Sequence, residues 1–187
     1  MKYLFLFIII KITILFSLNL FAKNGPVTGL NLPRFVSLKS NDVNLRVGPS
    51  TNYPILIKYI QSNLPIEIID EFDVWRKTKD HDNNIGWVHK SLIKGDRFAL
   101  VNQNLTSKKN IYDRPNGKVI GIIYKNNVIK LEKCLINWCY INNKKIEGWI
   151  SKKYIWGVYP KEKFNLSFMQ PLINQYWKIL ESSWLKQ

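Results

Sequence analysis

Soft metal ligands are scarce in this chain of 187 residues, which has only two cysteines and two histidines. His81 and His89 lie in the first half of the sequence, whereas Cys134 and Cys139 lie in the second. A structural zinc ion needs about four such ligands close together. We therefore expect no metal site and no cofactor.

Signatures of catalysis are also missing from the sequence. There is no glycine-rich phosphate-binding loop and no nucleophile elbow. A thiol peptidase needs a Cys–His pair with an oriented base, and the two cysteines here are expected to be joined to each other. Asp80 and Asp82 flank His81, but their Asn-rich surroundings favour a hairpin turn over acid–base chemistry. We expect that the protein is not an enzyme.

The chain has one long apolar run, over residues 4–20, and Lys11 interrupts it. Lys2 gives a basic start, and the small residue Ala22 follows shortly after the run. This order is typical of a secretory signal peptide, here residues 1–22. A retained membrane anchor is the alternative, although the run is shorter than the roughly 20 residues that a span needs. We expect cleavage after Ala22 and export to the periplasm or cell envelope.

Acidic residues are few, with 13 of them against 28 lysines and arginines, which gives a formal net charge of +15. A strongly basic chain favours an anionic partner such as nucleic acid, anionic lipid or an acidic envelope polymer. The secretory signal makes nucleic acid a poor choice. An abundance of Lys, Asn and Ile is also typical of AT-rich genomes, so selection for charge and compositional drift both stay open as explanations.

What the chain does contain is a repeat of about 60 residues. In each copy a tryptophan is followed by a polar stretch and a Gly-Trp-aliphatic triplet, and then by Leu92 or Tyr154 five residues after the second tryptophan. Without a leader, about 165 residues remain, which is enough for two small domains. We expect domains at residues 32–101 and 107–160, followed by a tail at 161–187. The matching elements are Trp75 with Gly86-Trp87-Val88 and Trp138 with Gly148-Trp149-Ile150.

Short segments of alternating polar and apolar residues predict β-strands in both copies. Val43, Leu45 and Val47 alternate with Asn44 and Arg46, and Gly48-Pro49 then breaks the pattern. Trp87 and Trp149 follow a glycine within a strand, where close packing is possible, so we expect them in the cores. Closely spaced short strands predict a small antiparallel barrel in each copy, and thus an all-β protein. The expected linker between the barrels is the polar stretch at residues 102–107.

Residues 44–51, with the sequence Asn-Leu-Arg-Val-Gly-Pro-Ser-Thr, resemble the opening motif of bacterial SH3-like (SH3b) domains. The triplet at 86–88 followed by Leu92 is similar to the strand and turn that close such domains. With residues 32–40 included, the chain resembles an exported proteobacterial family with two tandem modules. The second copy is less similar, because Tyr112 stands where the first copy has arginine. The resemblance implies two barrels in the cell envelope that bind the wall or a protein, with a ligand that is generally unknown.

The resemblance also places a binding groove beside the opening loop of the first copy. The residues expected to bind the ligand there are Asn44, Arg46, Tyr53, Tyr59 and Trp75. Exposed aromatic rings flanked by polar groups suit both sugars and peptides. Structural alternatives stay open for two of these residues. Arg46 would instead brace the loop by pairing with a carboxylate such as Glu71 or Asp73, and Trp75, like Trp138 in the second copy, would cover the mouth of its barrel.

The two cysteines flank a predicted hairpin turn. Cys134 ends one strand and Cys139 begins the next. An even number of cysteines in an exported chain favours a disulfide, and facing positions across a hairpin bring the sulfur atoms within bonding range. Two free thiols are the alternative. We predict a Cys134–Cys139 disulfide, whose short loop makes its entropic contribution small compared with that of a long-range bridge.

The tail is the part least similar to the family. Pro171 is suited to the start of a helix. The apolar and aromatic residues that would fall on one face of this helix are Leu172, Ile173, Tyr176, Trp177, Leu180 and Trp184. Such an amphipathic helix would dock on its own barrels, pair with a partner or lie on a lipid surface.

The sequence therefore predicts a non-catalytic, exported, all-β protein with two tandem SH3-like barrels and a short C-terminal amphipathic helix. The expected function is a cell-envelope binding module that recognises peptidoglycan or an extended peptide of an envelope protein. The alternative is a membrane-surface scaffold that uses the basic charge and the Trp-rich C-terminal helix. Nucleic acid is not expected as a partner.

Overall fold

The computed structural model describes residues 23–102, 108–143, 146–165, 172 and 175. The predicted signal peptide, residues 1–22, lies outside the described residues. The described chain forms two seven-stranded antiparallel sheets and one two-stranded hairpin. In this part of the chain, no helix is long and apolar enough to cross a membrane.

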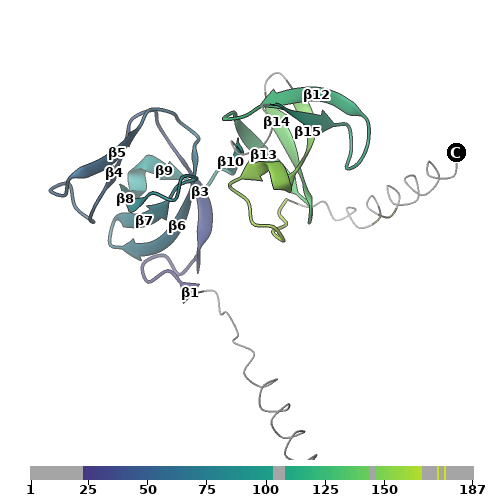
Figure 1. The fold of residues 1–187 in the computed structure, drawn as a ribbon. Coiled ribbons are helices and arrows are strands. Elements are labelled where there is room, and N and C mark those ends of the chain that lie inside the picture. The colour runs from purple at the N-terminus through teal and green to yellow at the C-terminus, as the bar shows by residue number, and fades with distance from the viewer. Residues whose placement is uncertain (1–22, 103–107, 144–145, 166–171, 173–174, 176–187) are drawn as a thin grey trace, which may run out of the picture.

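The first sheet has the strand order β5-β4-β8-β7-β6-β3-β9 and curls into a small barrel (Figure 1). A short 3-10 helix, η1 (Lys90–Leu92), precedes the last strand, and a hairpin of β1 (Lys23–Asn24) and β2 (Asn31–Leu32) precedes the first. The strands of this first barrel are β3 (Arg34–Leu38), β4 (Val43–Arg46), β5 (Ile55–Tyr59), β6 (Pro65–Phe72), β7 (Trp75–Lys79), β8 (Ile85–His89) and β9 (Ile93–Lys94).

The second sheet repeats this topology strand for strand, in the order β12-β11-β15-β14-β13-β10-β16. The 3-10 helix η2 (Lys152–Tyr154) stands where the first barrel has η1. The strands of this second barrel are β10 (Phe98–Val101), β11 (Lys108–Tyr112), β12 (Val119–Tyr124), β13 (Val128–Cys134), β14 (Trp138–Asn143), β15 (Ile146–Ser151) and β16 (Ile155–Trp156).

Each barrel closes around its own apolar core. In β4, Val43 and Leu45 are fully buried while Asn44 and Arg46 between and after them are only partly buried. In β11, Ile111 is fully buried and its neighbour Asn110 is exposed. The period-2 alternation thus places one face of each strand inside a barrel and the other in solvent. Burial of these aliphatic side chains supplies the main favourable term for folding.

The change from one barrel to the next occurs at residues 95–97, between β9 and β10. The predicted first domain ends at residue 101 and so includes Phe98–Val101, whereas the structure pairs this strand with β13 and β16 of the second barrel. The polar stretch expected to be the linker therefore begins after the first strand of the second barrel. Tertiary pairing, which the local sequence does not reveal, determines the sheet to which β10 belongs.

Aromatic side chains join the two barrels. The ring of Phe35 packs edge-on against Trp156, with centroids 5.0 Å apart, and its centroid lies 4.7 Å from that of Tyr159. The Tyr159 hydroxyl donates a hydrogen bond of 2.9 Å to Oε1 of Glu67 in the first barrel. Burial, reinforced by this carboxylate, raises the pKa of Tyr159. The junction is therefore a packed contact between neighbouring barrels.

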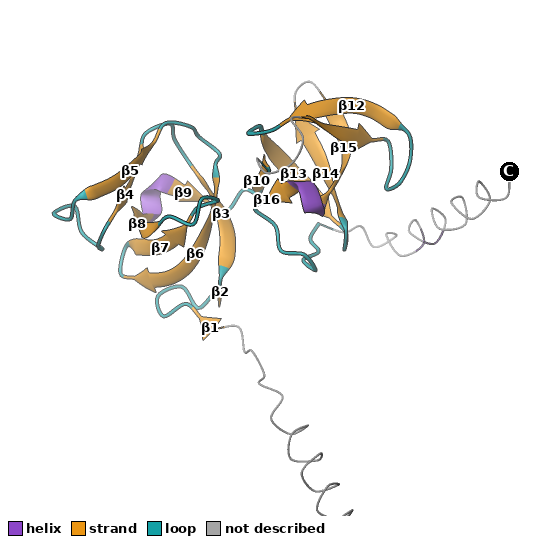
Figure 2. Cartoon of the chain, viewed as in Figure 1, coloured by secondary structure: helices purple, strands orange, loops and turns teal. Residues whose placement is uncertain are grey.

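The predicted C-terminal amphipathic helix requires a correction, although the all-β class fits. Among the described residues there is no helix of seven or more residues, and Figure 2 shows η1 and η2 as short turns among strands. The described chain after β16 instead turns back on the second barrel, where Phe164 forms an isolated antiparallel bridge with Cys134. Most of the segment proposed as helical lies outside the described residues, which include only Leu172 and Gln175 of it.

Candidate functional site

The opening loop of the first barrel, residues 47–54, connects β4 to the edge strand β5. Its two ends are held together by a hydrogen bond of 3.1 Å from the Val47 N–H to the Pro54 carbonyl. Arg46 adds a second bond, in which Nη1 donates to the Tyr53 carbonyl at 2.8 Å. Arg46 therefore braces the loop, but through a backbone carbonyl and not through either of the carboxylates considered from the sequence.

Gly48 and Tyr53 pack together inside this loop. A Cβ placed on Gly48 would lie 2.6 Å from the Tyr53 ring, so no larger side chain fits without displacing the ring. Despite this contact, Tyr53 is 47% exposed. The ring is therefore fixed on one face and open to solvent on the other, as expected of an aromatic contact residue.

Four apolar side chains of this hairpin are about half exposed, and together they form what we call the opening-loop surface: Val47, Tyr53, Ile55 and Leu56. The pairing of Arg46 with Ile55 across β4 and β5 keeps the two sides of the loop adjacent. Sequence reasoning identified Tyr53 but missed the three aliphatic residues. Only their position indicated that they are exposed. They lie directly before and after the turn, and the strand that follows the turn lies at the edge of its sheet.

Tyr59 and Trp75 require a correction, because both are buried and do not line an exposed aromatic surface. They are 9% and 8% exposed, respectively. The Tyr59 hydroxyl donates to Oδ2 of the buried Asp80 at 2.9 Å, and burial, followed by the charge of Asp80, raises the Tyr59 pKa. Trp75 packs edge-on against His89 with ring centroids 5.3 Å apart. These two side chains stabilise the barrel.

Asn44 lies on β4 next to Arg46, and its side chain is partly buried. Its Oδ1 atom is shielded from solvent and has no hydrogen-bond partner among the residues that the structure describes. A buried acceptor without a donor carries an energetic cost. Of the five residues predicted to bind a ligand, Arg46 and Tyr53 lie together at the opening loop, Asn44 lies beside them on β4, and Tyr59 and Trp75 contribute to the interior.

Glu71 is the most strongly perturbed carboxylate in the first barrel, and its role is structural. The Arg34 guanidinium lies 2.6 Å from it and that of Arg76 lies 3.6 Å away. The backbone and hydroxyl of Thr28 and the Val27 N–H also donate to it. Burial alone would raise the pKa of Glu71, but the hydrogen bonds from Arg34, Thr28 and Val27 outweigh it and lower the pKa to about 2. Glu71 thereby fastens the N-terminal hairpin to the barrel.

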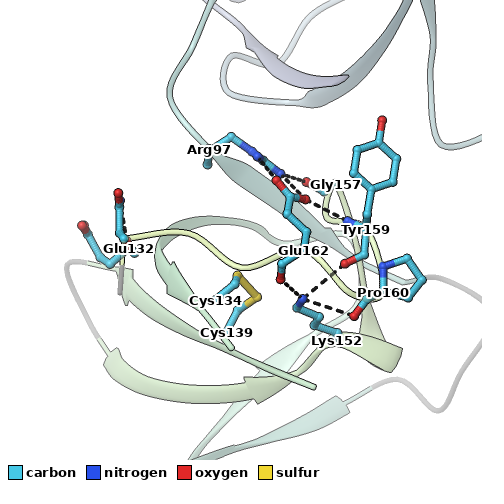
Figure 3. Close-up of a disulfide and its surroundings, with 10 residues drawn as sticks. Arg97, Glu132, Cys134, Cys139, Lys152, Gly157, Tyr159, Pro160 and Glu162 are labelled. Carbon is cyan, nitrogen blue, oxygen red and sulfur yellow. Dashed lines mark hydrogen bonds and ion pairs between the residues drawn. A yellow bond between two sulfur atoms is a disulfide. The ribbon is translucent and has the colours of Figure 1, made fainter. Parts of the chain in front are cut away.

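The second barrel contains the predicted disulfide, which joins Cys134 to Cys139 across paired positions of β13 and β14. Figure 3 shows it beside a cluster of charged residues at the end of the barrel. In that cluster Arg97 forms an ion pair with Glu162, and the Lys152 ammonium donates to the carbonyls of Tyr159, Pro160 and Glu162. Burial lowers the Lys152 pKa. This cluster holds the last described segment of the chain in place.

A cavity of about 490 Å³ lies in the second barrel beside η2. Its polar lining consists of Asn137, Ser151, Lys152 and Lys153, and its apolar lining consists of Ile136, Ile155, Val158 and Pro160. The Lys152 ammonium is already satisfied by three carbonyl groups, so it has little capacity to bind an anion. Within the described part of the chain, no group of three His, Cys, Asp or Glu side chains is placed to hold a metal ion.

The two pairs of tryptophans differ between the barrels. Trp149 is 3% exposed and belongs to the interior as expected, whereas Trp87 at the equivalent position is only partly buried. Trp138 begins β14 as Trp75 begins β7, yet it is partly exposed and packs edge-on against Tyr112, with centroids 5.3 Å apart. Equivalent positions in the repeat therefore do not have equivalent burial.

Comparison with known proteins identifies the first barrel. Residues 39–95 match the bacterial SH3 domain family, whereas no curated protein matches the chain. Among solved structures, NlpC1 from Trichomonas vaginalis is similar at 12% sequence identity and a TM-score of 0.28, over 70% of this chain and 48% of that one. The chain thus spans about half the length of that protein, and a likeness this weak establishes neither shared chemistry nor a shared partner. The segment that matches the bacterial SH3 domain family therefore runs from β4 to β9 and contains the opening loop.

Proposed function

We propose that this protein is a non-catalytic binding module of the cell envelope. Its first barrel would recognise peptidoglycan or an extended peptide of an envelope protein through the opening-loop surface. The observation that carries the proposal is the pairing of an exposed aromatic ring, Tyr53, with a loop that Arg46 holds in place inside a bacterial SH3 domain. Bacterial SH3 domains commonly bind cell-wall components.

The geometry of the loop favours binding in two ways. Half-exposed apolar side chains offer area that a ligand can cover, and aromatic rings contribute disproportionately to recognition. The hydrogen bonds across the loop, and the contact of Tyr53 with Gly48, fix the surface before a ligand arrives. A surface that is already ordered loses less conformational entropy on binding.

The disulfide supports an extracytoplasmic location. Cys134 and Cys139 are both fully buried and joined to each other. Structural disulfides persist in oxidising compartments and are rare in the cytosol. Together with the expected leader, this supports export to the periplasm or cell envelope, with the second barrel as a further SH3-like module in tandem.

Co-sedimentation of the full-length chain with purified peptidoglycan sacculi tests the proposal. The net charge of +15 makes non-specific adsorption the main competing explanation. Charge-driven adsorption weakens steeply as salt rises, because screening shortens the range of electrostatic attraction. We expect binding that persists at high salt. Binding that disappears at high salt, and that an equally basic unrelated protein reproduces at low salt, would contradict recognition by the loop.

A second arm distinguishes the two ligand classes. An amidase cuts the bond between the glycan strands and the stem peptides and releases both from the sacculus in soluble form. Each product is then tested as a competitor of sacculus binding: competition by the glycan strands would identify the glycan, and competition by the peptides would identify the peptide. If neither product competes, crosslinking to envelope proteins in cells, with a photoreactive group at position 53, tests the peptide of an envelope partner directly.

A further inference from the structure

Strand β12 forms the outer edge of the second barrel, at one end of its sheet. In Figure 1 it runs along the periphery of that barrel. Its alternate side chains Ile120, Ile122 and Tyr124 are 51%, 45% and 60% exposed, while Ile123 is 4% exposed and faces the core. The outward face of this edge strand is therefore an apolar row.

An apolar row on the outward face of an unpaired edge strand is unusual in a protein built from antiparallel sheets. The solvent face of an antiparallel sheet is normally polar. Exposed edge strands also carry unpaired backbone groups, and proteins normally protect them because another chain can pair with them. β12 combines an outward apolar face with an unpaired edge over its six residues. The same strand in the first barrel, β5, is shorter and exposes Ile55 and Leu56 at its beginning only.

Two lysines flank the apolar row. Lys118 and Lys125 lie directly before and after β12, and both are exposed. No ion pair to either lysine occurs among the described residues. The nearest carboxylate along the chain, that of Asp113, accepts the backbone N–H of Lys118. In the first barrel, by contrast, Lys58 on the edge strand pairs with Asp42 at 3.0 Å.

These charges disfavour a second copy of the chain as the occupant of this edge. Antiparallel pairing of β12 with β12 of another copy would bring Lys118 of one copy close to Lys125 of the other at both ends of the strand. Like charges that approach each other on paired strands are destabilising. A strand with acidic ends would instead gain an opposite charge at each end.

The backbone of β12 is also held in place from the inner side. A Cβ at Gly121 would meet the Cδ1 end of the Ile146 side chain, so this side chain lies directly against the backbone of β12. Ile146 in turn packs against the core. The edge strand is therefore in contact with the core of its barrel on its inner side.

We propose that β12 binds an extended segment of another polypeptide by strand addition. The partner would carry apolar side chains at alternate positions, to cover Ile120, Ile122 and Tyr124, and a carboxylate at each end, to pair with Lys118 and Lys125. Backbone hydrogen bonds would supply affinity, and the alternate side chains and terminal charges would supply selectivity. This site is separate from the opening-loop surface, so it does not depend on the proposed function of the first barrel.

Titration of the isotope-labelled full-length chain with a short blocked peptide tests the proposal. The peptide has glutamate at both ends and alternating valine and threonine between them. We expect amide shifts and slowed hydrogen exchange at Val119–Tyr124, with no change in the opening loop. A version of the peptide that is N-methylated at alternate residues keeps its side chains but cannot pair along one edge, and we expect it not to bind. Equal binding of the methylated peptide, or shifts confined to other strands, would overturn the proposal.

Reversal of the two lysine charges gives a second test of peptide binding. Because both lysines are exposed, their substitution should not disturb the fold. The double variant Lys118→Glu and Lys125→Glu should bind the glutamate-ended peptide about tenfold more weakly, since two weak attractions become repulsions. It should correspondingly prefer the same peptide with lysine ends. Lys58→Glu on β5 is the matched control and should leave the peptide affinity unchanged. Failure of the double variant to change its preference would contradict the role of the lysines.

Sedimentation and exchange of the protein alone complete the test. We expect a monomer in which the β12 amides that point away from β11 exchange readily before peptide is added. Protection of these outward amides in a dimer would show that a second copy occupies the edge, and their protection in a monomer would show that the chain covers its own edge. Either result would overturn the proposal. Sacculus binding is measured separately, so its outcome does not affect this inference.

Discussion

The two barrels share one strand order, but each secures the equivalent hairpin by a different chemistry. In the first barrel, Glu71 on β6 lies opposite Arg76 on β7, and the pair is buried. In the second, Cys134 on β13 lies opposite Cys139 on β14, and a disulfide joins them. An ion-pair network and a covalent bond thus occupy equivalent positions in the two barrels. The stability of the first barrel should therefore depend on pH, and that of the second should depend on whether the disulfide is reduced.

The barrels also differ at their surfaces. The first has an eight-residue opening loop, residues 47–54, which Arg46 braces and which carries the exposed ring of Tyr53. The second has a shorter connection from β11 to β12, and it exposes the apolar edge of β12 instead. The repeated scaffold therefore presents two different surfaces. This difference is why we assign envelope recognition to the first barrel and a separate polypeptide partner to the second.

Truncation of the equivalent tryptophans should have the largest effect on stability. Trp75→Ala removes a ring that is 8% exposed, so the free energy of unfolding should fall by about 3–5 kcal/mol. Trp138→Ala removes a partly exposed ring, so the loss should be smaller, below about 2 kcal/mol. Urea unfolding monitored by circular dichroism measures both. Equal losses would show that burial at the two positions does not differ as described.

Replacement of Glu71 should have the next largest effect, confined to the first barrel. Glu71→Gln leaves Arg34 and Arg76 without their carboxylate, so the free energy of unfolding should fall by about 3 kcal/mol at neutral pH. Hydrogen exchange should increase in the N-terminal hairpin and β6. Glu132→Gln is the matched control, because the Glu132 carboxylate pairs with Lys130 at the surface, and its effect should be below about 1 kcal/mol.

The same carboxylate predicts an acid sensitivity with a definite sign. The Glu71 pKa is lowered from 4.5 to about 2 in the folded protein. Its stabilising contribution is therefore complete above the unfolded-state pKa and is lost as the pH falls toward 2. The stability difference between the wild-type protein and Glu71→Gln should shrink between about pH 5 and pH 2. A difference that stays constant over this range would contradict the lowered pKa.

Removal of the disulfide should have a smaller effect, confined to the second barrel. The bond closes a short loop, with a sequence separation of 5, so the chain-entropy estimate is about 2 kcal/mol. The double variant Cys134→Ala and Cys139→Ala should show faster hydrogen exchange in β13 and β14 and unchanged exchange in β6 and β7. Equal acceleration in both barrels would indicate that the packed junction makes them unfold as one unit.

The sequence predicted local features well and tertiary ones less well. Alternation in residues 43–46 indicated a strand with one buried face, and the cysteines flanking a turn predicted the disulfide, which the structure confirms. The resemblance of the first repeat to bacterial SH3 domains is also confirmed. Each of these features depends on residues that are close together in the chain.

The features that were missed depend on distant or backbone partners. Arg46 donates to a carbonyl, which no residue type reveals. The resemblance to SH3-like domains places Trp75 beside the binding groove, but cross-strand packing against His89 buries it. Glu71 contacts Thr28, 43 residues earlier in the sequence. Sequence pattern gives the strands, whereas the long-range contacts determine which side chains stay exposed.

One comparison tests the central claim, that the opening-loop surface of the first barrel recognises the envelope. Tyr53→Ala and Tyr124→Ala each remove an exposed ring, one from each barrel. Loss of an aromatic contact residue costs about 2 kcal/mol or more, roughly a 30-fold loss of affinity. In high-salt co-sedimentation with sacculi, Tyr53→Ala should bind about 30-fold more weakly while Tyr124→Ala binds as the wild-type protein does. Normal binding by Tyr53→Ala together with loss of binding by Tyr124→Ala would contradict the account and assign envelope recognition to the second barrel.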